Sequence, residues 1–221
     1  MAFTERAAAV GVTPVRTNRL NAIVDGVFAI AMTLLVLDLP RPSAFGQVTH
    51  DLEVHWDAYI AYLVSFATLG VVWLEHHGMM LAVRRTSRTF IECTFAFLLF
   101  VALLPWPTAL TAEFADEAST SSLVTFIYST TMFFIALSLM GSWAYLGRHP
   151  ELLAEDLTPS FQQSLRRTRL VCLPYVVAMP IAFVSPLASL VIDASVVVYL
   201  AATRSPLERA EARRADASQT E

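Results

Sequence analysis

The fold of this chain is decided by the stretch Arg19-Leu-Asn-Ala-Ile-Val-Asp25-Gly-Val-Phe-Ala-Ile30-Ala-Met-Thr-Leu34-Leu-Val-Leu37-Asp38. It is apolar from Gly26 to Leu37 and reaches, with its flanks, the roughly 20 residues that a membrane-spanning helix needs. Asp25 is the exception, because an ionisable group inside a span is costly unless it is paired or faces water. The stretch therefore predicts a transmembrane helix whose carboxylate docks on neighbouring helices.

The helical spacing of this stretch separates a slim apolar face from the charged one. One narrow stripe is formed by Ile23, Gly26, Ile30, Leu34 and Leu37, with Thr33 at its edge. Asp25 points to the opposite side. By spacing alone, such a stripe is most often a surface for helix packing.

The composition indicates a membrane protein throughout the chain. Of its 221 residues, 56% are hydrophobic and 15% are charged, and the mean hydropathy is +0.56, which is too apolar for an ordinary soluble domain. Six apolar spans are predicted, at about 19–38, 57–77, 90–110, 122–146, 169–184 and 187–203. Pro105 and Pro107 are expected to kink or break the third span, and Ser185-Pro186 leaves room only for a tight hairpin between the last two. The predicted fold class is an all-α membrane protein.

The arginines predict the orientation of the chain in the bilayer. All 15 basic residues are arginine, and an N-terminus in the cytoplasm leaves Arg41 as the single one outside, as the positive-inside rule favours. Six spans then place both termini in the cytoplasm. The expected division is a cytoplasmic lead over 1–17, a transmembrane domain over 18–204 and a charged cytoplasmic tail over 205–221.

Several function classes find no support in the sequence. It has no glycine-rich phosphate loop, no His-Glu-x-x-His and no Gly-x-Ser-x-Gly, so no enzyme is predicted. No basic stripe favours nucleic acid. His76 and His77 point about 100° apart on a helix, which is poor for one metal ion, and no metal site or cofactor is expected.

The sequence of the first predicted span resembles that of a known family. Arg19, followed after three residues by Ile23-Val24-Asp25, resembles the Arg-x-x-x-Phe-Ser-Asp signature of the lysosomal potassium channel and its bacterial relatives, with Ile-Val in place of Phe-Ser. The segment Gly26–Leu37 is similar to the bacterial version almost residue for residue. Further similarity lies in Ser65-Phe66, Trp73, His76-His77 and the segment from Phe100 to Leu110. The resemblance covers most of residues 16–110.

The resemblance implies a potassium-selective or potassium-preferring channel in the plasma membrane of a bacterium. It implies a homotetramer with the first helix at the pore axis, so that the partners are potassium ions, the bilayer and further copies of the chain. Ile30, Leu34 and Leu37 would form the constriction, because the equivalent residues do so in the relatives, and an apolar ring raises a barrier to ions. Thr33 and Ile23 would also line the pore. The Thr33 hydroxyl either faces the ion or bonds back to its own helix.

The charged residues have expected places around this pore. Asp38 closes the first span and would form a negative ring at the outer mouth that concentrates cations. Arg19 and Asp25 are poorly placed to pair with each other. The expected structural network joins them to the Trp73 indole and to one histidine of His76 and His77.

Some alternatives stay open on the sequence. A proton-coupled secondary transporter or proton channel is one, although the chain lacks the internal doubling usual in transporters. A non-conducting membrane scaffold is another. Asp193, an acid inside the sixth span, either marks an ion path or pairs with a polar residue of the fourth span among Ser129, Thr130 and Thr131.

Overall fold

The computed structural model describes residues 17–39, 48–114, 118–154 and 158–203. Its elements, all helical, are α2 (Thr17–Leu34), η1 (Leu35–Asp38), α3 (Val48–Val54), α4 (Trp56–Leu81), α5 (Arg88–Leu103), α6 (Pro105–Glu113), α7 (Ala118–Arg148), η3 (Pro150–Leu152), α8 (Thr158–Ile181) and α9 (Pro186–Ala202). The predicted all-α class is confirmed. The predicted lead, apart from Thr17, and the predicted tail over 205–221 lie outside the described residues.

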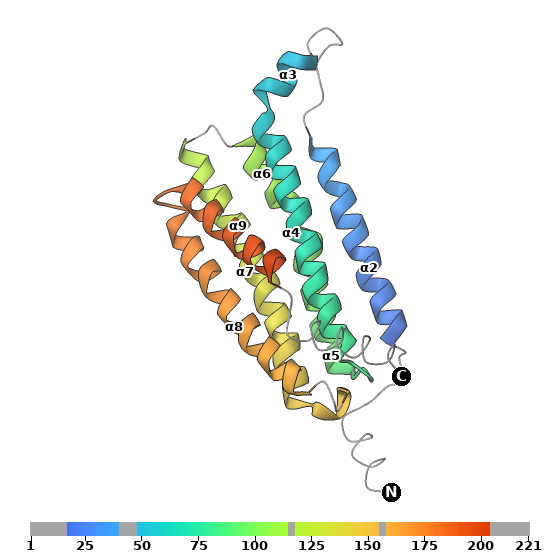
Figure 1. Ribbon diagram of the computed structural model, residues 1–221. Coiled ribbons are helices and arrows are strands. Elements are labelled where there is room, and N and C mark those ends of the chain that lie inside the picture. The colour runs from blue at the N-terminus through green and yellow to red at the C-terminus, as the bar shows by residue number, and fades with distance from the viewer. Residues whose placement is uncertain (1–16, 40–47, 115–117, 155–157, 204–221) are drawn as a thin grey trace, which may run out of the picture.

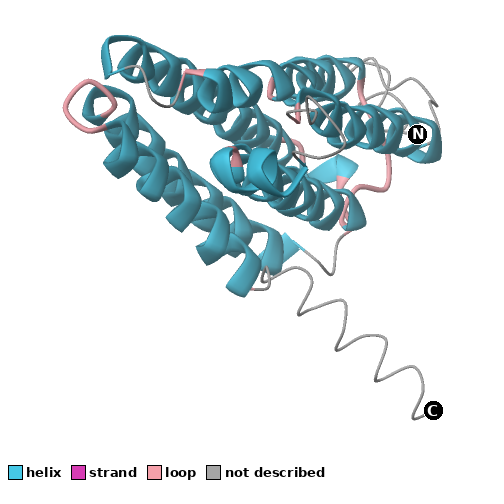
Figure 2. Cartoon of the chain, turned by 90° about the horizontal axis from the view of Figure 1, so that it is seen from above, coloured by secondary structure: helices cyan, strands magenta, loops and turns pink. Residues whose placement is uncertain are grey.

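The long helices form a bundle in which successive helices run in alternating directions (Figure 1). Helix α7 is at its centre and contacts α5, α6, α8 and α9, whereas α2 packs at one side against α5 and α4. Figure 2 shows the helices from above, packed side by side. The core contains large buried side chains such as Phe28, Phe90, Phe97 and Trp143.

Local sequence signals explain where several helices begin and end. Ser87 caps α5 by accepting a hydrogen bond from the Phe90 N–H, and Ser185 caps α9 by accepting one from the Ala188 N–H. Helix α5 ends before Leu104, and α6 begins at Pro105, because proline fits the first turn of a helix but not its interior. The predicted break in the third span and the tight turn after α8 are both confirmed.

Two predicted segments differ from the structure. The six predicted spans leave residues 39–56 as a connecting segment, but α3 lies within them. Helix α8 begins eleven residues before the predicted start at 169, because Phe161, Ser164, Leu165 and Thr168 recur at helical spacing and are buried. That buried face lets a polar segment continue as helix.

Four helical segments are long and apolar enough to cross a membrane. They are Thr17–Leu37, Ala58–Leu81, Arg88–Glu113 and Thr120–Arg148. Helix α9 is apolar but has only 17 residues, and α8 carries Arg166, Arg167 and Arg169 near its middle. Six crossings therefore stay a prediction.

A buried ion pair holds α4, α8 and α9 together. Arg167 Nη1 of α8 lies 3.0 Å from Glu75 Oε1 of α4, and both side chains are nearly buried. The other guanidinium nitrogen, Nη2, donates at 2.7 Å to both the carbonyl and the hydroxyl oxygen of Thr203, just beyond α9. Arg167 thus neutralises an acid inside the bundle and binds the carboxyl end of α9, where helix carbonyls lack partners.

We expect Arg167→Gln to destabilise the fold by about 3–5 kcal/mol, because it leaves the Glu75 carboxylate buried without its cation. Unfolding of the purified protein in detergent, followed by tryptophan fluorescence, measures this loss. Arg166→Gln is the matched control, since Arg166 is the exposed neighbour, and should change little. The double variant Glu75→Gln/Arg167→Gln should recover part of the loss. Equal stability of Arg167→Gln and Arg166→Gln would show that the pair contributes nothing.

Candidate functional site

Helix α2 divides sharply into a packed side and an uncovered side. The packed side consists of Leu20, Val24, Phe28 and Ala31, and it continues into η1 with Leu35. Phe28 contacts Phe97 of α5 with ring centroids 5.9 Å apart. This side of α2 therefore packs against α5.

The apolar stripe predicted from the sequence lies on the uncovered side. Ile30 is 61% exposed and Leu37 is 60% exposed, and Ile23 and Leu34 are also open. A β-carbon added at Gly26 would meet nothing within 4 Å, apart from its own helix. Within a membrane protein, a line of exposed branched side chains faces lipid, another subunit or a pore.

Thr33 and Asp38 occupy the edge and the end of this stripe. The Thr33 hydroxyl donates a 2.9 Å hydrogen bond to the Ile30 carbonyl, which is the back-bond that the sequence left as one alternative. Its oxygen keeps a lone pair that can still accept a bond. Asp38 is the last residue of η1, and its side chain lies outside the described part of the structure.

The Asp25 carboxylate is bonded to α4. Trp73 Nε1 donates a 2.8 Å hydrogen bond to Asp25 Oδ1, and the His77 ring stacks on the Trp73 ring at 5.1 Å. Arg19 is exposed and has no hydrogen bond or ion pair with the described residues. The structure thus brings together Asp25, Trp73 and His77, and the wider network with Arg19 stays a prediction.

The two adjacent histidines point to different environments. His76 is buried and stacks on Phe97 of α5 at 5.3 Å, whereas His77 is exposed. His76 Nε2 has no hydrogen-bond partner among the described residues. Within that same part of the chain, no group of three histidine, cysteine or acidic side chains is placed to hold a metal ion.

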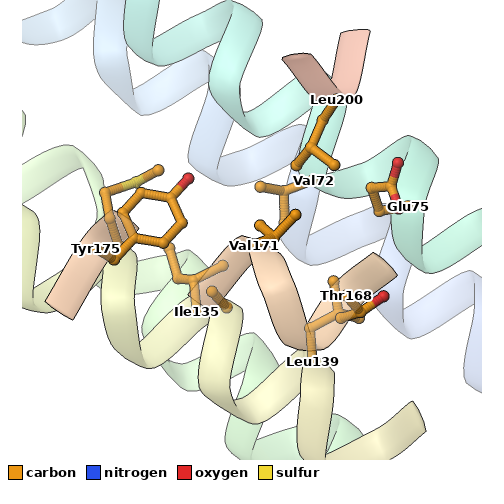
Figure 3. Close-up of a pocket in the computed structure, with 10 residues that line it drawn as sticks. Val72, Glu75, Ile135, Leu139, Thr168, Val171, Tyr175 and Leu200 are labelled. Atoms are coloured by element: carbon orange, nitrogen blue, oxygen red, sulfur yellow. The ribbon is translucent and has the colours of Figure 1, made fainter. Parts of the chain in front are cut away.

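A cavity inside the bundle, away from α2, is too small to be an alternative ion path. It has a volume of about 30 Å³ and lies between α4, α7, α8 and α9. Figure 3 shows its wall, where Ile135, Leu139 and Val171 face Val72, with Glu75 at one side. Since one water molecule needs about 10–15 Å³ on this measure, the space holds a water or two within mostly aliphatic walls.

Sequence analysis missed the pairing of Glu75 and the surroundings of Asp193. The sequence analysis assigns Glu75 no role, although an acid at the end of an apolar span needs a cation. Asp193 accepts a 2.6 Å hydrogen bond from Ser129 Oγ of α7, which confirms the pairing alternative. A second cavity, which Asp193 lines, could not be inferred, because its shape depends on how four helices pack.

Comparison with known proteins identifies the family. The sequence profile described as "Endosomal/lysosomal potassium channel TMEM175" matches residues 19–105. A potassium channel of Streptomyces collinus is 34% identical over 199 residues, which cover 89% of this chain and 97% of the relative. The chain belongs to the TMEM175 family. The part that the profile matches begins in α2 and ends at the first residue of α6, so it contains the whole stripe and the Asp25–Trp73 pair.

Two further TMEM175 proteins bear on the fold and on the ion. The crystal structure of a lysosomal potassium-selective channel TMEM175 homolog from Chamaesiphon minutus superposes with a TM-score of 0.72 at 30% identity, covering 84% of this chain and 96% of that one. The endosomal/lysosomal proton channel TMEM175 of Gallus gallus is 33% identical over 139 residues, which cover 55% of this chain and 28% of the relative. The family names therefore refer to both potassium and protons.

We expect the Trp73–Asp25 hydrogen bond to contribute about 1 kcal/mol to the docking of α2, as is typical of such bonds. A double-mutant cycle of Trp73→Phe and Asp25→Ala, with stability measured by denaturant unfolding in detergent, should give a coupling energy of this size. Trp106→Phe is the control, because Trp106 is an exposed tryptophan of α6. Strictly additive losses would show that the bond does not hold α2 in place.

Proposed function

We propose that the protein is a potassium channel that conducts passively through a pore lined by the α2 helices of four identical subunits. The observation that carries this proposal is the exposure of the stripe Ile23–Ile30–Leu34–Leu37 on the helix that bears the family signature. A single subunit leaves this face uncovered, although its other face is fully packed. The potassium channel names of the Streptomyces and Chamaesiphon relatives support the choice of ion.

Assembly from several copies follows from the same face. One helix cannot enclose a pore, so further copies must supply the rest of the wall. Ala22 and Ala29 are exposed beside the stripe, and small residues let helix backbones approach closely within a bilayer. We propose that these residues contact the neighbouring subunit.

The proposed topology has six crossings per subunit and both termini in the cytoplasm. Helices α8 and α9 form the last two crossings, joined by the turn at Ser185. Arg84, Arg85, Arg88 and Arg148 then lie on the cytoplasmic side, as the positive-inside rule favours. The membrane is the plasma membrane of a bacterium, in keeping with the bacterial relatives.

In the proposed mechanism, Ile30 forms the narrowest ring, and Leu34 and Leu37 continue it outward. The branched side chain of isoleucine is stiff at χ1, so the ring does not swing aside readily. An ion must lose water against apolar carbon, and potassium, which is the more weakly hydrated ion, loses less than sodium. Thr33 offers a hydroxyl near the ring, Ile23 lines the wider inner entrance, and Asp38 concentrates cations at the outer mouth.

Proton conduction is the second candidate. The animal TMEM175 relatives are named proton channels, and an apolar constriction that admits a file of water could pass protons. The chain spans only about 28% of the Gallus gallus relative, so that name has less weight than those of the full-length bacterial relatives. Potassium in such a channel is a permeant ion and not a resident cofactor.

Flux through the purified protein in liposomes tests the function directly. A potassium gradient should drive rapid flux that follows the membrane potential and does not saturate like a carrier. The reversal potential should follow the potassium gradient and respond little to a pH gradient. A reversal potential set by the pH gradient would favour the proton channel, slow saturable flux would favour a transporter, and no flux would favour a scaffold.

We expect Ile30→Asn to raise the total current and to lower the potassium-over-sodium preference several-fold, because amide groups would replace lost hydration for both ions. Bilayer recordings with potassium on one side and sodium on the other measure both effects. Leu34→Asn and Leu37→Asn should act in the same direction but more weakly. Leu173→Asn on α8 is the matched control, since Leu173 is 60% exposed, as Ile30 is 61% exposed. Unchanged currents in Ile30→Asn, with altered ones in Leu37→Asn, would place the narrowest point further out.

A further inference from the structure

A large cavity lies away from α2, in the half of the bundle that contains the start of α4. Its volume is about 430 Å³, and it lies between α4, α6, α7 and α9. Its mouth carries exposed side chains of α4 and α9, namely Trp56, Ile60, Leu187 and Val191. None of its described lining residues belongs to α2, so this cavity is separate from the stripe.

One carboxylate lies in the wall of this cavity. Asp193 is 2% exposed, and its Oδ2 accepts a 2.6 Å hydrogen bond from Ser129 Oγ. Its Oδ1 has no partner among the described residues. The nearby Ser189 hydroxyl, whose oxygen is 3.0 Å from Ser129 Oγ, donates instead to the Ala178 carbonyl at 2.9 Å. The protein thus provides a single donor for this carboxylate.

Chemistry limits what can complete this site. A buried acid with an open oxygen needs a donor, and a positively charged donor compensates for burial best. Apart from Asp193 and Tyr128, the described lining residues are not ionisable, and most of them are aliphatic. Such walls suit a hydrocarbon body, whereas a bare inorganic cation would need several oxygen ligands around it. The site therefore combines one anionic end with apolar walls and an aromatic at the rim.

We propose that this cavity binds a lipophilic ammonium compound, with its N–H donating to the Asp193 carboxylate and its apolar body between α4 and α9. The ammonium supplies the missing donor and the compensating charge in one group. Trp56 at the mouth covers the hydrocarbon body, as tryptophan does at many apolar sites with a wet rim. This inference does not depend on whether the protein conducts potassium, protons or neither.

Equilibrium binding of radiolabelled 1-adamantylamine to the full-length protein in nanodiscs tests the proposal. We expect saturable binding with one site per chain. Asp193→Asn should weaken it by roughly 30-fold or more, as for the loss of one partner of a buried charge pair. Ser195→Ala, an exposed position on the same helix, should leave binding unchanged. The alcohol 1-adamantanol, which has the same body without the charge, should compete poorly.

Two further measurements keep the test decisive. If Asp193→Asn does not fold, Ala61→Phe fills the cavity from α4 while leaving Asp193 in place, and it should abolish binding. The comparison of amine and alcohol on the wild-type protein needs no variant at all. Equal affinity for amine and alcohol, binding that survives Asp193→Asn, one site per four chains, or no binding to the wild type would each overturn the proposal. One site per four chains would indicate a site on the pore axis. No binding to the wild type would indicate that a neighbouring subunit fills the cavity.

Discussion

The hydrogen bond from Trp73 to Asp25, together with the contact of Phe28 with Phe97, sets the rotation of α2 about its own axis, and the position of the candidate pathway depends on that rotation. In a bilayer, lipid tails are as apolar as leucine, so apolar contact alone distinguishes poorly between the faces of a greasy helix. A carboxylate has far fewer acceptable positions. Because successive residues lie about 100° apart, a slip of one residue would turn Ile30 off the line it shares with Ile23 and Leu34.

The same principle recurs elsewhere in the bundle. Polar pairs join α4 to α8 through Glu75 and Arg167, and α4 to α6 through Ser65 and Thr108, whose hydroxyl oxygens are 3.1 Å apart. Helix α4 therefore has polar links to three other helices, including α2. These links join specific pairs of helices, whereas the buried core between the helices is apolar. Most of the buried side chains are apolar, and a few polar pairs align the helices with one another.

Part of this arrangement could be predicted from the sequence, and the reasons are local. Proline determines the break at Leu104, and the apolar run after Asp25 determines the first long helix. The direction of α4 places Trp73 at the depth of Asp25. By contrast, the sequence predicts the same cytoplasmic place for Arg166, Arg167 and Arg169. Only the packing of α8 turns Arg167 inward to Glu75. The adjacent His76 and His77 likewise divide into a buried and an exposed residue because of where α5 lies.

The short helix η1 continues α2 at its carboxyl end with a different pitch. Its backbone is of the 3₁₀ type from Leu35 to Asp38, and such a helix advances about 2.0 Å and turns about 120° per residue, against about 1.5 Å and 100° in an α-helix. Residues three apart are then eclipsed, so Leu37 comes closer to standing directly above Leu34. Over three residues, conversion to α-helical pitch would rotate Leu37 back by about 60° and lower it by about 1.5 Å. At this end of the stripe, a change of helix type would therefore rotate Leu37 about the helix axis and shift it along the axis at the same time.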